Sequence, residues 1–108
     1  MLDEWWDTNE YRKQFVPYHT ARIALLYEWC RTCPTENMTR FMNLMLSWYD
    51  LGEALDREYR FRMENGYPTD EIEEAIGWYT ECSAILAERF HEHHAERLVP
   101  SVGHPVSG

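Results

Sequence analysis

Two of the three cysteines, Cys30 and Cys33, form a single C-x-x-C pair in this 108-residue chain. Redox chemistry needs a thiol with a lowered pKa, typically at the N-terminus of a helix. This pair ends a helix predicted over residues 18–32, where the helix dipole acts in the opposite sense. Zinc would need Cys82 and a histidine to complete four ligands. We therefore interpret the cysteines as structural, with a zinc site as the alternative.

A second candidate for metal chemistry is the histidine-rich stretch at residues 91–94. It lacks the H-E-x-x-H spacing of zinc proteases, because Ala95 stands four residues after His91. Glu88 and His91 have the Glu-x-x-His spacing of di-iron bundles, but the sequence holds no second copy of that motif. We interpret His91 and His94 as solvated residues near a helix end, and we predict no metal and no cofactor. A zinc or di-iron helical bundle is the alternative.

Two pairs of carboxylates, Glu53 with Asp56 and Glu71 with Glu74, are each spaced three residues apart. They resemble the magnesium-binding motifs of the all-α nucleotide pyrophosphohydrolases, but the two motifs occur here in the reverse order and without a basic cluster for phosphate. We interpret them as solvated helix charges. The chain also lacks a Gly-rich phosphate loop and a nucleophile elbow, so we predict that it is not an enzyme.

The helix predicted over residues 69–98 is the element around which the chain is organised. Thr69 or Asp70 caps it after Pro68, and Pro100 closes it. Its predicted core stripe, at helical spacing, consists of Ile72, Ile76, Tyr79, Leu86 and Phe90. Residues 70–97 hold eight acids and two bases, so this element carries −6 of the formal net charge of −9.

A second face of the same helix is the predicted partner-binding surface. Its glutamates follow one another along one side, and large apolar residues lie among them, which is typical of binding hot spots. The predicted partner-binding residues are Glu74, Trp78, Glu81, Ile85, Glu88 and Glu92, with Phe61 from the hairpin tip. The alternatives are an ordinary solvated helix face, or a face that self-association buries.

The rest of the chain predicts an all-α fold, a small bundle of about four helices. We expect a short helix that ends before Pro17, a second over residues 18–32, and a third over residues 36–65 that forms a long antiparallel hairpin with the fourth. Gly52 could kink the third helix or permit close packing. Residues 1–98 are predicted to be one helical domain and residues 99–108 a flexible tail.

Two predicted helices are apolar on more than one side. The helix over residues 18–32 presents Leu25 and Trp29 opposite its core residues, and the first half of the third helix adds Met42, Leu46 and Tyr49. Because an apolar face is normally buried, we expect both of these segments to lie between neighbouring helices.

The net charge and the lengths of the apolar runs limit the classes of function that fit this chain. The net charge of −9 and pI near 4.9 disfavour direct binding to nucleic acid or to an anionic membrane, and favour a partner with a basic surface. No apolar run is long enough to span a bilayer, and no signal peptide is evident, so we expect a cytoplasmic protein.

In size and charge alone the chain resembles small acidic inhibitors of phages, including anti-CRISPR and anti-restriction proteins. This resemblance implies a non-enzymatic protein that binds and inhibits a basic, nucleic-acid-handling protein, in the host cytoplasm if a phage encodes it. An obligate oligomeric subunit, or a homodimer, is the alternative.

Overall fold

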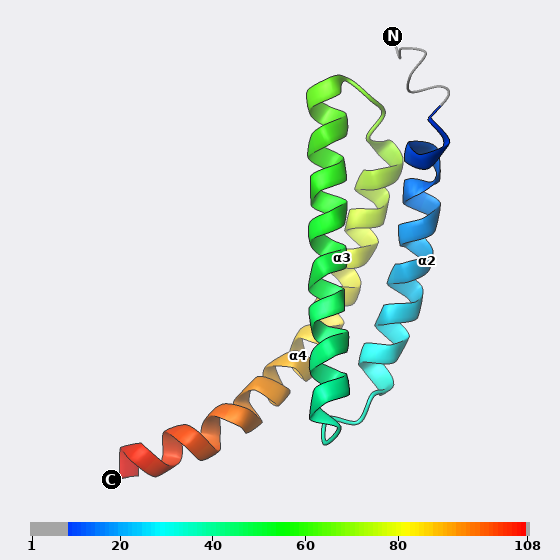
Figure 1. Cartoon of the computed structure of the whole chain (residues 1–108). Coiled ribbons are helices and arrows are strands. Elements are labelled where there is room, and N and C mark those ends of the chain that lie inside the picture. The colour runs from blue at the N-terminus through cyan, green and yellow to red at the C-terminus, as the bar shows by residue number, and fades with distance from the viewer. Residues whose placement is uncertain (1–8, 108) are drawn as a thin grey trace.

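Three helices form the part of the chain that the structure, a computed structural model, describes: the backbone of residues 9–107 and the side chains of residues 9–91. The helices are α2 (Glu10–Thr32), α3 (Met38–Asn65) and α4 (Asp70–Ser107). Each contacts both others, and Figure 1 shows the C-terminal part of α4 running beyond the bundle. The all-α prediction is confirmed, whereas the predicted count of four helices is not matched among the described residues.

The predicted break at Pro17 is wrong, because α2 continues through this residue. Proline removes one backbone N–H and with it one helical hydrogen bond. However, Phe15 and Val16 before it and His19 and Ile23 after it are all buried, while Pro17 itself is exposed. The buried residues on both sides of the proline hold one continuous helix against the core, so two predicted helices become one.

Local capping signals set the other helix ends much as the sequence indicates. The side chain of Asn9 accepts a hydrogen bond from the backbone N–H of Arg12 at 2.9 Å, and Asn37 caps α3 in the same way. Gly66 ends α3 with a φ of 72°, a left-handed conformation that favours glycine. The predicted end of the third helix at residue 65 is therefore confirmed, and after a short link α4 begins at Asp70 and packs against α3.

The C-terminal end of α4 differs from the prediction. The sequence predicted a helix end near Leu98, but the backbone is helical through Pro100 and Pro105 as far as Ser107. Proline lacks a donor, but its fixed φ is compatible with helical geometry. The predicted helix end is therefore wrong, while the division into a domain at 1–98 and a flexible tail at 99–108 stays a prediction.

The core lies where the three helices meet. Of the stripe predicted for the last helix, Ile72, Leu86 and Phe90 are buried, and Ile76 and Tyr79 are partly buried. The most completely buried large side chains come from all three helices: Ile23, Cys30, Phe41, Trp48, Leu51, Leu55, Ile72 and Leu86. Apolar burial of this kind supplies most of the favourable free energy of folding.

At Gly52 the Tyr79 side chain of α4 lies directly against the backbone of α3. A Cβ atom at this position would lie under 3.0 Å from three atoms of the Tyr79 side chain. The Tyr79 ring stacks on Trp48 with centroids 4.5 Å apart, and its hydroxyl donates to the Trp48 carbonyl at 2.7 Å. Of the two roles predicted for Gly52, the structure therefore supports close packing.

The second apolar sides of α2 and α3 are not covered as predicted. Leu25 and Trp29 on α2 are exposed, and so are Leu46 and Tyr49 on α3. The reason is that the two predicted N-terminal helices are one helix, so no separate fourth helix covers these sides among the described residues. In the same part of the chain, no helix has an apolar stretch long enough to cross a membrane.

Candidate protein-binding surface

The second face of α4 is open to solvent over the residues that the structure describes. Trp78 is 38% exposed and Ile85 is 58% exposed, although both are large apolar side chains. Glu74, Glu81 and Glu88 are also exposed. We call these five residues the acidic face of α4. Because Trp78 and Ile85 lie seven residues apart, as do the successive glutamates, the apolar groups and the carboxylates run along the helix in parallel.

Trp78 is partly seated between two helices. It lines a shallow hollow with Val16 and Thr20 of α2 and with Glu74 and Ala75 of α4. The indole thus has one side against the bundle and another in solvent. A side chain held in this way loses little conformational freedom when a partner covers it, which favours its use as an anchor.

Within the part of the chain whose side chains are described, the carboxylates of the acidic face form no ion pair. None of the ion pairs among the described residues includes Glu74, Glu81 or Glu88. By comparison, two of the exposed carboxylates of α3 are paired along their own helix, Glu53 with Arg57 and Asp56 with Arg60. The negative charge of α4 is therefore available to a basic partner.

Phe61, which the sequence assigned to the same surface, lies elsewhere. The Arg12 guanidinium sits 4.1 Å from the centroid of the Phe61 ring, and the Tyr67 ring lies 5.8 Å away. Phe61 lines a hollow with Tyr11, Phe15 and other residues between α2 and α3, on the other flank of α2 from Trp78. The structure does not bring Phe61 together with the acidic face. The side chains of Glu92 and His94 lie outside the described residues.

A buried ionic cluster between α2 and α3 escaped the sequence analysis. Glu58 pairs with Arg12 and, at 2.9 Å, with Arg62, whose Nη2 also donates to the Arg12 carbonyl at 2.9 Å. The side chains of Glu58 and Arg62 are only 2% and 4% exposed. In the sequence these two residues look like an ordinary surface pair four residues apart, so nothing local marks them as buried.

Arg89 is a second residue that the sequence analysis missed. Its guanidinium donates to the carbonyls of Arg31 and Cys33, at the C-terminal end of α2, and lies 5.4 Å from the centroid of the Phe41 ring. The last carbonyls of a helix lack partners within the helix, and a cation satisfies them well. Arg89 therefore connects α4 to the end of α2.

The cysteines are buried free thiols. Burial, followed by the neighbouring Cys33, raises the pKa of Cys30 to about 11, against the opposing effect of Arg89. Burial also raises the pKa of Cys82. A thiol with a raised pKa stays protonated at neutral pH and is a poor nucleophile. Among the side chains that the structure describes, no three His, Cys, Asp or Glu residues come together as a metal site requires.

Comparison with known proteins identifies no relative from which a role for this surface could be inferred. No family model matches the chain, and no curated protein or solved structure is significantly similar to it.

Proposed function

We propose that this chain is a non-enzymatic binding protein that docks on a basic protein surface through the acidic face of α4. The observation that carries the proposal is the exposure of Trp78 and Ile85 beside carboxylates that no described cation neutralises. Burying the two apolar side chains would supply affinity, and the glutamates would select a basic partner and accelerate the encounter.

The class of partner that fits best is a nucleic-acid-handling protein, which the chain would inhibit. Such proteins present Lys and Arg to phosphates, and an acidic helix can occupy the same basic groove. Glu74, Glu81 and Glu88 are about 10.5 Å apart at ~1.5 Å per residue. This spacing fits general charge complementarity rather than detailed phosphate mimicry. We place this activity in the cytoplasm, or in the host cytoplasm for a phage-encoded chain.

The test compares wild type with the Trp78→Ala/Glu81→Arg variant in affinity capture from a nuclease-treated lysate. The matched control is Tyr49→Ala/Glu53→Arg, which changes an exposed aromatic residue and a glutamate on α3. We expect wild type and control to capture the same basic protein, and the α4 variant to lose it while keeping its helical circular dichroism. Equal capture by all three proteins would exclude the acidic face as the binding surface.

Inhibition is tested separately with the captured protein. If the chain occupies its nucleic-acid groove, adding the chain should displace a labelled oligonucleotide, and added salt should weaken the complex. A ternary complex of chain, partner and oligonucleotide would contradict inhibition by competition while leaving the binding surface intact.

A further inference from the structure

The solvent side of α2 carries an apolar stripe that nothing in the described structure covers. Tyr11, Tyr18 and Leu25 recur every seven residues and are 71%, 63% and 53% exposed. Three residues after each comes another exposed residue on the same side. We call the whole set the outer stripe: Tyr11, Gln14, Tyr18, Ala21, Leu25 and Glu28. Alternation of three and four residues is the pattern of a helix that packs against another helix in a coiled coil.

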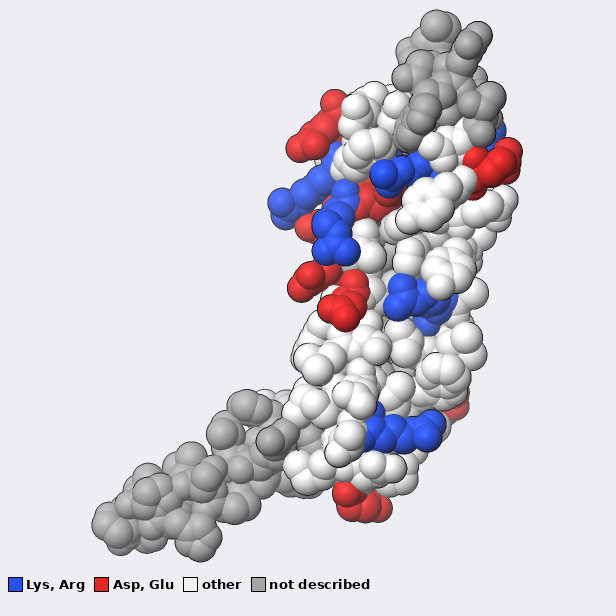
Figure 2. Space-filling model, viewed as in Figure 1, with Lys and Arg blue, Asp and Glu red and all other residues white. Residues whose placement is uncertain are grey.

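The middle of α2 is almost free of charge. Residues 14–27 contain no acid, and their one arginine, Arg22, lies with Nη1 3.1 Å from Nδ1 of His19 in the same helix. Figure 2 shows the side of the molecule formed by α2 and α3: charged groups gather on one half of α3, a few lie along α2, and a mostly uncharged surface separates them from the blue and red groups at the α2–α3 turn. A helix face that water covers normally carries charges, so this one is suited to a partner.

We propose that a second copy of this chain covers the outer stripe, with the two α2 helices packed antiparallel about a two-fold axis midway between Tyr18 and Ala21. In this arrangement Tyr18 of each copy lies over the small Ala21 of the other, and Leu25 lies over Gln14. Apart from Glu28, which pairs with Arg31 of its own helix, the stripe is uncharged and therefore complementary to itself, whereas a strongly charged partner would find almost no counter-charge on it. The interface is therefore isologous, with the same residues contributed by both copies.

Charges at the ends of α2 support the antiparallel direction. Glu10 is exposed at the N-terminal end, and Arg31, which pairs with Glu28 of its own helix, is exposed at the C-terminal end. Antiparallel packing brings Glu10 of each copy close to Arg31 of the other, twice in the dimer. Parallel packing would instead place the two Glu10 side chains side by side, which is unfavourable.

Two hollows flank the outer stripe where the ends of a second α2 would arrive. The first is lined by Tyr11, Gln14, Phe15 and Tyr18, together with Glu10 and His19. The first four are spaced like a coiled-coil hole, which takes one side chain of the facing helix. In the antiparallel pair, Leu25 of the second copy lies over this hollow, and Trp29 lies at its edge beside Glu10.

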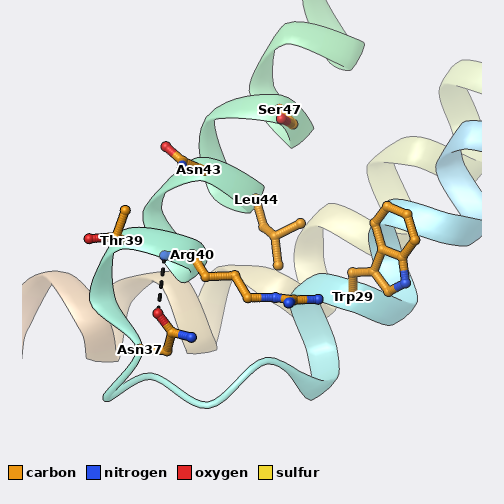
Figure 3. A pocket seen from close by; sticks show the side chains of 7 residues that line it. All are labelled: Trp29, Asn37, Thr39, Arg40, Asn43, Leu44 and Ser47. Carbon is orange, nitrogen blue, oxygen red and sulfur yellow. Dashed lines mark hydrogen bonds between the residues drawn. The ribbon is translucent and has the colours of Figure 1, made fainter.

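The second hollow lies beside Trp29, between α2 and the start of α3. Figure 3 shows the Arg40 side chain extending toward Trp29, with Leu44 above it. Its other lining residues are polar and uncharged: Asn37, Thr39, Asn43 and Ser47. In the antiparallel pair, Tyr11 of the second copy reaches this hollow, and Glu10 of the same copy comes near Arg40. Each end of α2 therefore meets a matching hollow on the other copy.

The first experiment is sedimentation velocity of the full chain over a range of concentrations. We expect a dimer for wild type and a monomer for Leu25→Glu, because the substitution places an uncompensated carboxylate in the stripe. Ile85→Glu is the matched control, an equally exposed residue on α4, and should remain dimeric. A monomeric wild type at every concentration, or dissociation by Ile85→Glu alone, would overturn the proposal.

A second experiment does not depend on how well Leu25→Glu folds. Ala21 and Ala84 are both exposed alanines, on α2 and α4. We expect a short bis-maleimide to link Ala21→Cys into a covalent dimer, because the two positions meet near the axis, and to leave Ala84→Cys monomeric on a denaturing gel. The native cysteines are buried, so wild type serves as the background control. Preferential linkage through Ala84→Cys would place the self-interface on α4 instead.

The dimer does not rest on the proposed function. The outer stripe lies on the α3 side of α2, where Trp29 borders a hollow with residues of α3, and the acidic face lies on α4. Failure of partner capture would therefore leave the dimer untouched, and a monomeric wild type would leave the acidic face untouched.

Discussion

Glu58 pairs with two arginines, of which Arg62 is almost fully buried and Arg12 has a side chain that is 25% exposed. Removing Glu58 takes away the carboxylate that compensates the buried charge of Arg62, which costs far more than losing a surface pair. We predict that Glu58→Ala lowers the free energy of unfolding by about 3–5 kcal/mol, measured by urea denaturation.

The control for Glu58 is Glu53→Ala, which breaks a pair with Arg57 whose two side chains are each 70% exposed. Exposed pairs contribute little, because solvent screens them. We expect a change of less than about 1 kcal/mol for this variant. Equal losses in the two variants would contradict the role assigned to Glu58.

The buried His19 should make the free energy of unfolding depend on pH. Burial, with a smaller contribution from Arg22, lowers its pKa below 6.5. The unfolded chain therefore binds a proton more readily than the folded chain, so the free energy of unfolding should fall as the pH drops through about 6.5. His19→Gln should lose this component. Urea titrations of both proteins between pH 7.5 and pH 5.5 measure it, and identical slopes would show that His19 does not contribute.

At the scale of the element, the approach of α3 and α4 depends on a glycine. Alanine normally stabilises a helix relative to glycine by up to about 1 kcal/mol. At Gly52 we expect the opposite, a loss of about 1–3 kcal/mol, because the new methyl group would displace Tyr79 from Trp48. Gly77→Ala, with nothing within 4 Å of the added Cβ, should stabilise the protein. Thermal unfolding of both variants measures the difference, and a stabilised Gly52→Ala would contradict close packing.

The end of α3 and most of the inner stripe of α4 were predictable because they depend on local chemistry and spacing. The glycine cap at Gly66 acts within one turn, and most residues that repeat at helical spacing are buried. Pro17 misled the prediction because tertiary burial on both sides of it outweighs one missing hydrogen bond. The two apolar sides of α2 were recognised in the sequence. Which of them faces solvent depends on the number of neighbouring helices, and residue spacing within one helix does not reveal that number.

At the scale of the whole molecule, the two proposed surfaces should act independently. The Leu25→Glu variant should keep its affinity for the basic partner, and Trp78→Ala/Glu81→Arg should keep the dimer, because distant sites without shared contacts are usually additive. Sedimentation and a binding titration on each variant check this expectation. Loss of both properties in either variant would show that the surfaces are coupled.

The candidate site was only partly predictable from the sequence. The acidic face follows from residue spacing along one helix, and its members lie together on α4. Phe61 belongs to another helix, and its surroundings are set by Arg12, 49 residues earlier in the chain. Contacts at that separation depend on how helices dock, which one sequence does not specify.

The buried cluster at Glu58 also has a consequence for the alignment of the helices. Aliphatic and aromatic side chains can pack against one another in more than one register. If α2 slid along α3 by one turn, about 5.4 Å, the apolar residues would find new neighbours, but Arg12 would no longer reach Glu58. Because a buried charge without its partner is costly, we expect loss of the Arg12–Glu58 contact to destabilise the competing registers. Charges that are costly to bury would thus determine which turn of α2 meets which turn of α3.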